Sequence, residues 1–199
     1  LTGNSGTNIN NFIGTTDNQD IILKRNNENI GALKNNGIAF GTKALENSNN
    51  LSLGNIGIGN GALEKTTTTS YNVAVGHLAL NKNRNHNNVA LGAYSLTNDT
   101  SGTNNVAVGF GAMYSKEAGA NNVAVGFEAL RANNGINNIA IGSNALRNNL
   151  IGANNTAIGF KSLEFNKNNH SNVTLGAFTL TNDTMGANNV AVGYGAMFN

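Results

Sequence analysis

The chain has 199 residues, of which 25 are glycine and about 43 are asparagine, and it contains no cysteine, proline or tryptophan. The absence of cysteine excludes disulfide frameworks, cysteine-ligated metal centres and cysteine nucleophiles. Charged residues make up only 11% of the chain, and 12 basic against 10 acidic residues leave a net charge of +2 that is scattered along it. A nucleic-acid interface needs clustered Lys and Arg, so we do not expect one. Hydrophobic residues still reach 39%, which favours a folded, repetitive β structure over disorder.

The first 36 residues have a pattern of their own. Residues 21–24 and 30–33 are apolar runs on either side of an asparagine-containing turn at 25–28, which predicts a β-hairpin. Residues 12–14 predict a short strand ahead of it. We expect residues 1–36 to form a cap or adaptor segment that protects the open edge of the β structure that follows.

From residue 37 to residue 199 one line of sequence recurs, forming a second segment. Its form is Asn-Val-Ala-Val-Gly, two variable residues, then Ala-Leu, as in residues 72–80 and 122–130. The glycine returns every 16–18 residues, and a period near 17 is too short for a helical repeat. Val-Ala-Val alternates large and small residues, as a β-strand does. The repeat glycines are Gly41, Gly59, Gly76, Gly92, Gly109, Gly126, Gly142, Gly159, Gly176 and Gly193.

This repeat predicts an all-β fold, a parallel β-solenoid of about ten coils over residues 37–199, each coil with two short strands and two turns. Glycine would allow the bend after each strand, and the Asn-Asn pair would form the opposite turn and stack into amide ladders. We expect the Val, Ile and Leu residues of the strand, with the later Leu or Met, to fill the interior. The small residue between them would then face a neighbouring chain. The candidates for this contact are Ala74, Ala107, Ala124, Ala140 and Ala191.

A longer period lies over the short one. Residues 92–100 return almost unchanged as residues 176–184, an offset of 84 residues or five short repeats. His86 falls on His170 at the same offset. We interpret this as the duplication of a block of five repeats.

The residues that could carry chemistry do not form a catalytic or metal-binding pattern. The glycines of residues 57–61 lie in the repeat register, so we interpret them as structural and not as a phosphate-binding loop. Asp99 and Asp183 each lie alone in a turn, where an Asx turn is favoured over a calcium site. We therefore predict that the chain is not an enzyme, has no catalytic residues, and needs no metal or cofactor.

Histidines and aromatic residues leave alternatives open. His77, His86 and His170 are expected in exposed turns, while copies of one histidine meeting on a threefold axis remain an alternative. The rings that follow the repeat glycines either pack between coils, which we favour, or are presented to a glycan or surface. The sequence does not assign a ligand-binding residue.

The line Asn-Val-Ala-Val-Gly-x-x-Ala-Leu, as in residues 105–113, resembles the head repeats of trimeric autotransporter adhesins, the YadA-like heads. Similar repeats occur in tail fibres of phages and giant viruses, and residues 12–20 resemble the lead-in segment of fibre proteins. The resemblance covers nearly the whole chain, although the period here is longer than in the adhesin heads. It implies a left-handed parallel β-roll, three identical chains around one axis, and a role in attachment.

We therefore expect a non-enzymatic, structural and adhesive segment of a homotrimeric fibre, extracellular and on the surface of a bacterium. Its partners would be itself and a receptor on a host cell or surface, with a glycan among the candidates. No apolar run is long enough for direct membrane insertion. The alternative is a phage or viral tail-fibre segment that binds a host receptor, and a more remote one is a protein that binds ice or crystal surfaces. The chain begins without methionine and ends inside a repeat, so we interpret it as part of a longer protein.

Overall fold

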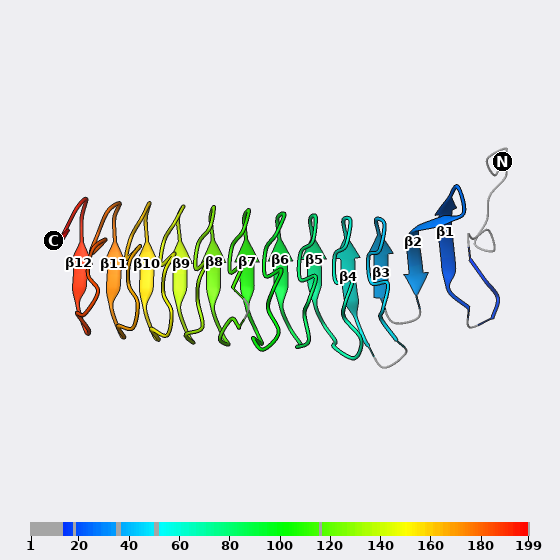
Figure 1. Ribbon diagram of the computed structural model, residues 1–199, viewed down its shortest axis with the longest axis horizontal. Helices are drawn as coiled ribbons and strands as arrows, with labels where there is room; N and C mark the ends of the chain where they lie inside the picture. The colour runs from blue at the N-terminus through cyan, green and yellow to red at the C-terminus, as the bar shows by residue number, and fades with distance from the viewer. Residues whose placement is uncertain (1–13, 18, 35–36, 50–51, 116, 199) are drawn as a thin grey trace, which may run out of the picture.

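The structure is a computed structural model that describes residues 14–17, 19–34, 37–49, 52–115 and 117–198. The described residues form one twelve-stranded sheet in which the strands follow one another in chain order. The molecule is a rod with β1 and β12 at opposite ends (Figure 1). The predicted all-β, parallel β-solenoid is confirmed.

An antiparallel hairpin begins the sheet, as the sequence predicts. It consists of β1 (Ile21–Arg25) and β2 (Glu28–Lys34). Asn26 and Asn27 join them with φ of 47° and 64°, the left-handed pair that a tight two-residue hairpin turn requires. β2 also pairs antiparallel with β3 (Gly37–Phe40), so the hairpin covers the edge of the first solenoid strand. The strand predicted at 12–14 lies outside the described residues, apart from Gly14 in a bend.

The strands from β3 to β12 pair in parallel, one strand per coil, and make about nine turns of solenoid in the described part of the chain. Equivalent residues of the repeat lie side by side, as Ala107 and Ala124 do. The strands after β3 are β4 (Asn55–Ile58), β5 (Val73–Val75), β6 (Val89–Leu91), β7 (Val106–Val108), β8 (Val123–Val125), β9 (Ile139–Ile141), β10 (Thr156–Ile158), β11 (Val173–Leu175) and β12 (Val190–Val192).

The other side of each coil differs from the prediction, because the described residues form turns there and not a second strand. The Leu or Met four residues after each repeat glycine has φ between 47° and 53°. Backbone bonds still join neighbouring coils on this side. The N–H of Leu63 donates to the carbonyl of Ala79 (3.0 Å), and the N–H of Lys65 donates to the carbonyl of Asn81 (2.9 Å). Since the next coil satisfies these groups, the segment does not need to be extended.

The repeat glycines occupy the bend after each strand, where all ten have φ between 119° and 138°. Gly126 illustrates the requirement: a Cβ on this residue would lie 2.6 Å from the carbonyl oxygen of Gly142 in the next coil. Any side chain here would therefore clash with backbone, in addition to the strain of a positive φ.

The prediction that the Val, Ile and Leu residues of the strands fill the interior of the coil is wrong. From Leu45 to Leu180 the later Leu or Met does point inward, but its partner across the coil is the small residue of the strand. A Cβ on Gly57, which occupies the alanine position of β4, would lie 3.3 Å from Cγ of Leu45. The coil is one large side chain thick, so only a methyl group fits opposite the leucine. The residues proposed to contact another chain are instead 0–4% exposed within their own chain: Ala74, Ala107, Ala124, Ala140 and Ala191.

A ladder of buried asparagines runs beside this apolar core, at the residue before each three-residue strand. The N–H of Asn122 donates to Oδ1 of Asn105 (2.9 Å), and the N–H of Asn138 donates to Oδ1 of Asn122 (2.8 Å). From Asn72 to Asn172, each side-chain amide also donates to a backbone carbonyl of the adjacent turn, as Asn122 does to Gly135 (2.9 Å). The ladder thus satisfies backbone and side-chain groups that the narrow interior hides from water.

Candidate functional site

The outer face of the sheet carries two rows of apolar side chains, from the two residues that flank the buried small residue of each strand. In β9, Ile139 and Ile141 are 39% and 40% exposed, although Ala140 between them is fully buried. Because the strands are paired in register, these side chains form continuous rows from β4 to β12, with Thr156 of β10 as their one polar member. We call this surface the strand face.

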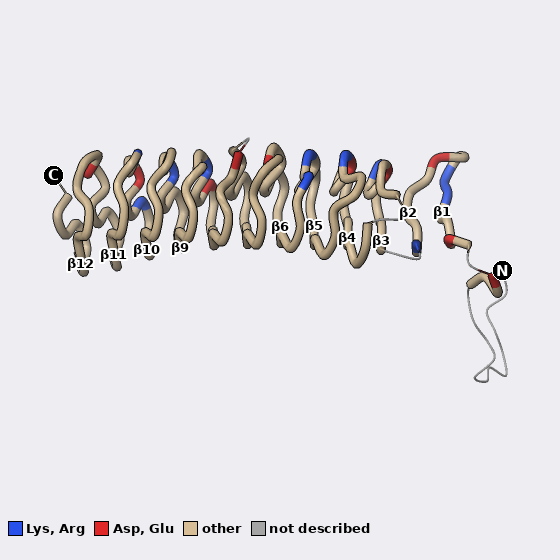
Figure 2. Tube along the Cα trace, turned by 90° about the horizontal axis from the view of Figure 1, so that it is seen from below, with Lys and Arg blue, Asp and Glu red and all other residues tan. Residues whose placement is uncertain are grey.

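The charged residues lie away from the strand face. The strands β4 to β12 contain no Lys, Arg, Asp or Glu. Figure 2 shows the charged positions of the solenoid gathered along the side opposite these strands. The rod therefore has one uncharged apolar side and one side that carries its charges.

Aromatic rings line the rod just after the bend that ends each strand. His77, Tyr94, Phe110 and Phe127 follow one another from coil to coil, with ring centroids 5.3–5.7 Å apart. After a coil with Ser143 at this position, the rings resume at Phe160. The rings pack between coils, as favoured above, yet Phe110 and Phe127 remain 48% and 50% exposed. The same rings therefore pack against each other and face the solvent.

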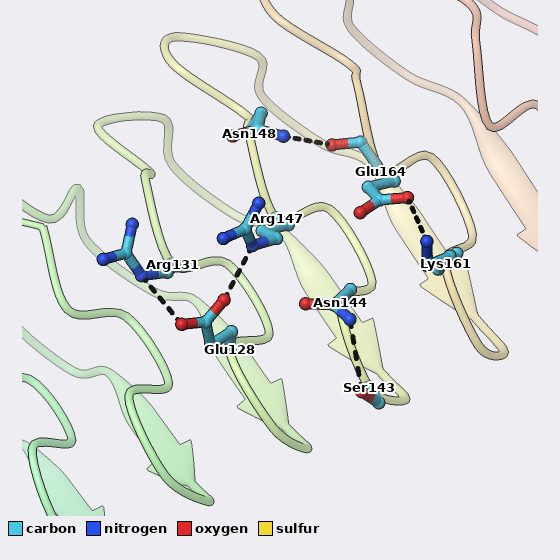
Figure 3. A network of polar contacts seen from close by, with 8 residues as sticks. All are labelled: Glu128, Arg131, Ser143, Asn144, Arg147, Asn148, Lys161 and Glu164. Carbon is cyan, nitrogen blue, oxygen red and sulfur yellow. Dashed lines mark hydrogen bonds and ion pairs between the residues drawn. The ribbon is translucent and has the colours of Figure 1, made fainter.

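A charged network lies next to this aromatic row, since Glu128 and Arg131 line one surface with Phe110 and Tyr114. Figure 3 shows the ion pairs of the network. Glu128 forms ion pairs with two arginines: Arg131 Nε lies 3.1 Å from Oε1, and Arg147 Nε donates a hydrogen bond to Oε2 (2.8 Å). One coil beyond Arg147, Lys161 Nζ lies 3.5 Å from Oε2 of Glu164. No sequence motif marks these residues, because their proximity depends on the coil register.

The predicted turn residues take structural positions. Nδ1 of His86 accepts the N–H of Ser70 (2.9 Å), and Nδ1 of His170 accepts the N–H of Ala153 (3.0 Å). The two duplicated histidines therefore make the same coil-to-coil bond. Asp99 forms the expected turn, with Oδ1 accepting the N–H groups of residues 101 and 102. Asp183 does the same with residues 185 and 186.

An exposed ladder of side-chain amides also crosses the coils. Nδ2 of Asn104 donates to Oδ1 of Asn121 (3.1 Å), and this pattern continues through Asn137 to Asn154. The sequence-based expectation of stacked amides is thus confirmed for these four residues. Because each amide bonds the next, the ladder holds the outer turns of four coils in a fixed spacing.

These features define the class of the molecule, a β-solenoid of about 17-residue coils with an N-terminal antiparallel hairpin. Comparisons with protein-family models, with curated proteins and with solved structures gave no match. Within the described ranges no three His, Asp or Glu side chains gather as a metal site requires. The same residues include no helix long and apolar enough to cross a membrane.

Proposed function

We propose that the chain is a non-enzymatic rod segment of a homotrimeric fibre that attaches to cells or surfaces. The observation that carries the proposal is the strand face, which is apolar and free of charge from β4 to β12. A continuous exposed apolar surface of this kind is typical of a protein–protein interface. A second copy of the chain is the partner that best matches it, because its side chains repeat at the same spacing. The resemblance to the heads of trimeric adhesins supports an assembly of three chains.

In such an assembly, attachment would be carried by the surfaces that remain exposed to solvent. The strand faces would be buried at the axis, while the charged side and the aromatic row would face the surroundings. Several weak contacts on one rigid rod gain strength from their high effective concentration, so no single tight site is required. The location we propose is the surface of a bacterium, with the tail fibre of a virus as the alternative.

The assembly is tested with one outward-facing strand residue. Val125→Arg places a charge in the middle of the strand face, where burial without a partner is costly. Sedimentation equilibrium should find a trimer for the native chain and a folded monomer for the variant. Asn168→Arg is the matched control, since Asn168 lies exposed in a turn, and it should remain trimeric. A monomeric native chain, or equal assembly of the two variants, would contradict the proposal.

Attachment is tested on the same pair of proteins. The trimer formed by Asn168→Arg should bind target cells at least tenfold more tightly per chain than the Val125→Arg monomer, because only the trimer gains from multivalency. Equal binding per chain would rule out attachment by repeated weak contacts.

A further inference from the structure

A notch interrupts the charged and aromatic side of the rod at Gly111. The second residue after the repeat glycine forms an outward column, which contains Tyr94, Gly111 and Glu128 in three successive coils. Tyr94 and Glu128 are two coils apart, about 9.5 Å, and Gly111 leaves the space between them open. Phe110 flanks the gap on one side, and Tyr114 and Arg131 flank it on the other. The resulting cleft has a volume of about 220 Å³.

A glycine in this column does not make a notch by itself. Gly61 has the same place in its coil, but a Cβ there would lie 2.6 Å from Cδ2 of Leu78, so the next coil covers the space. At Gly111 the nearest atom to such a Cβ is Cγ of Glu128, at 3.6 Å. The open cleft thus depends on the residues of the neighbouring coils.

The glycine and the rings of the notch recur at an offset of 84 residues, as Phe178, Tyr194, Gly195 and Phe198. They lie at the last described coil, and nothing comes within 4 Å of a Cβ on Gly195. Each ring of the cleft is replaced by another ring, and the glycine by a glycine. Elsewhere in the block the chemistry does change, since Ser101 corresponds to Met185. The rings and the glycine therefore recur, but within the described residues only Gly111 has a coil on both sides.

The notch also has a charged rim. Cζ of Arg131 lies 5.4 Å from the centroid of the Tyr114 ring, and its Nε bonds Glu128. Arg147 bonds the other oxygen of Glu128, so one carboxylate and two guanidinium groups leave a local charge of +1. Figure 3 shows the terminal nitrogens of both arginines directed away from Glu128. These N–H donors are placed to bind an anion from outside.

We propose that the Gly111 notch binds a pyranose residue of an acidic saccharide, with its ring against the aromatic walls and its carboxylate on Arg131. A pyranose has an apolar C–H face, which suits the negative face of an aromatic ring, and a polar rim, which suits the ion pair. A quaternary ammonium group also favours aromatic walls, but here Arg131 already places a positive charge over Tyr114. The biological role rests on the attachment function proposed above, whereas the notch itself is formed within one chain.

The experiment is calorimetric titration of the folded chain with trigalacturonic acid, and with neutral galactotriose for comparison. We expect binding of the acid that is at least fivefold tighter than that of the neutral sugar and that weakens with salt. Gly111→Asn should reduce the affinity at least tenfold by filling the notch. Asparagine is compatible with this backbone, because Asn144 has the same place in its coil with φ of 58°.

Two further variants separate the contributions. Arg131→Gln should remove the preference for the acid but keep weak binding of both sugars. Phe160→Ala removes a ring of similar exposure from a coil in which Lys161 takes the place of Gly111, and this variant should bind like the native chain. Loss of binding in Phe160→Ala, unchanged binding in Gly111→Asn, or binding of choline in place of the saccharides would overturn the proposal. The Val125→Arg monomer should bind a single trisaccharide like the trimer, so failure of assembly and failure of the notch are distinguishable.

Discussion

Asp99 is an acid in a column of buried asparagines, seven residues after the repeat glycine. In later coils the column bonds from amide to amide: Asn149 donates to Asn133 (2.7 Å), and Asn166 donates to Asn149 (2.8 Å). A carboxylate has no N–H to donate, so Asp99 cannot continue this pattern. Its Oδ2 is instead buried without a hydrogen-bond partner. Burial raises the pKa of Asp99 to about 6, although backbone N–H groups of Gly102 and Ser101 act in the opposite direction.

This pKa determines how stability depends on pH. The folded pKa is above the unfolded value of 3.8, so the folded state holds the proton more strongly. The contribution of Asp99 to stability is therefore full below about pH 4 and is lost as the pH rises through 6. At pH 7 the charged, buried group costs on the order of 2–3 kcal/mol.

Asp99→Asn should therefore raise the free energy of unfolding at pH 7 by about 2 kcal/mol. The new amide has a ready acceptor in the carbonyl of Gly102, because Asn149 donates to Gly152 at the same offset (2.8 Å). Urea unfolding at several pH values measures the effect. The difference between variant and native chain should shrink toward zero as the pH falls from 7 to 4, and a difference that is constant across this range would contradict the explanation.

For a strand of the solenoid, the sequence does not determine which of the two faces is buried. Val123, Ala124 and Val125 alternate as any strand does, and both faces are apolar. Alternation therefore predicts the strand but not which face is inside. The thickness of the coil decides this, because one leucine from the opposite turn leaves room only for a methyl group.

Ala124→Leu should destabilise the chain by at least 2 kcal/mol, since the interior has no space for three further carbon atoms. Val125→Leu enlarges the next residue on the outer face and should change stability by less than about 0.5 kcal/mol. Thermal and urea unfolding are measured with Leu91→Arg as the common background, because this outward residue lies two coils away and its charge should keep both variants monomeric. Equal costs at the two positions would mean that the strand face is assigned wrongly.

Turns are the elements that the sequence predicted least well. Leu63 and Met113 adopt a left-handed conformation that non-glycine residues rarely take, so local preference favours an extended second strand there. The strain is offset by burial of the side chain and by bonds to the next coil, both of which are tertiary. By contrast, the N-terminal hairpin was predictable because Asn26 and Asn27 form its turn from local preference alone.

At the scale of the whole molecule, each coil contacts only its neighbours, as in other solenoids. Period and parallel order could be predicted because ten glycines repeat in register. The Gly111 notch could be predicted only in part. The 84-residue offset marks its rings, but the approach of Glu128 and Arg131 depends on how neighbouring coils stack.

Deletion of residues 93–176 should give a shorter folded rod, because it joins Gly92 to Ala177 at equivalent positions and removes five whole coils. The length should fall by about 24 Å, measurable by small-angle scattering, while the circular dichroism per residue stays the same. Deletion of residues 93–168 is the control, since it removes a fraction of a coil and places the repeat out of register. If both deletions fold equally well, register is not what holds the stack together.

A cut in one exposed turn does not separate the rod into two pieces. Leu150 and Ile151 are 45% and 57% exposed between β9 and β10, where a protease can reach the backbone. After cleavage there, the two strands would still be paired in parallel, and the N–H of Asn155 would still donate to Asn138. The peptide bond between two coils contributes little to holding them together, so a rod cleaved by a protease in this turn would keep its shape.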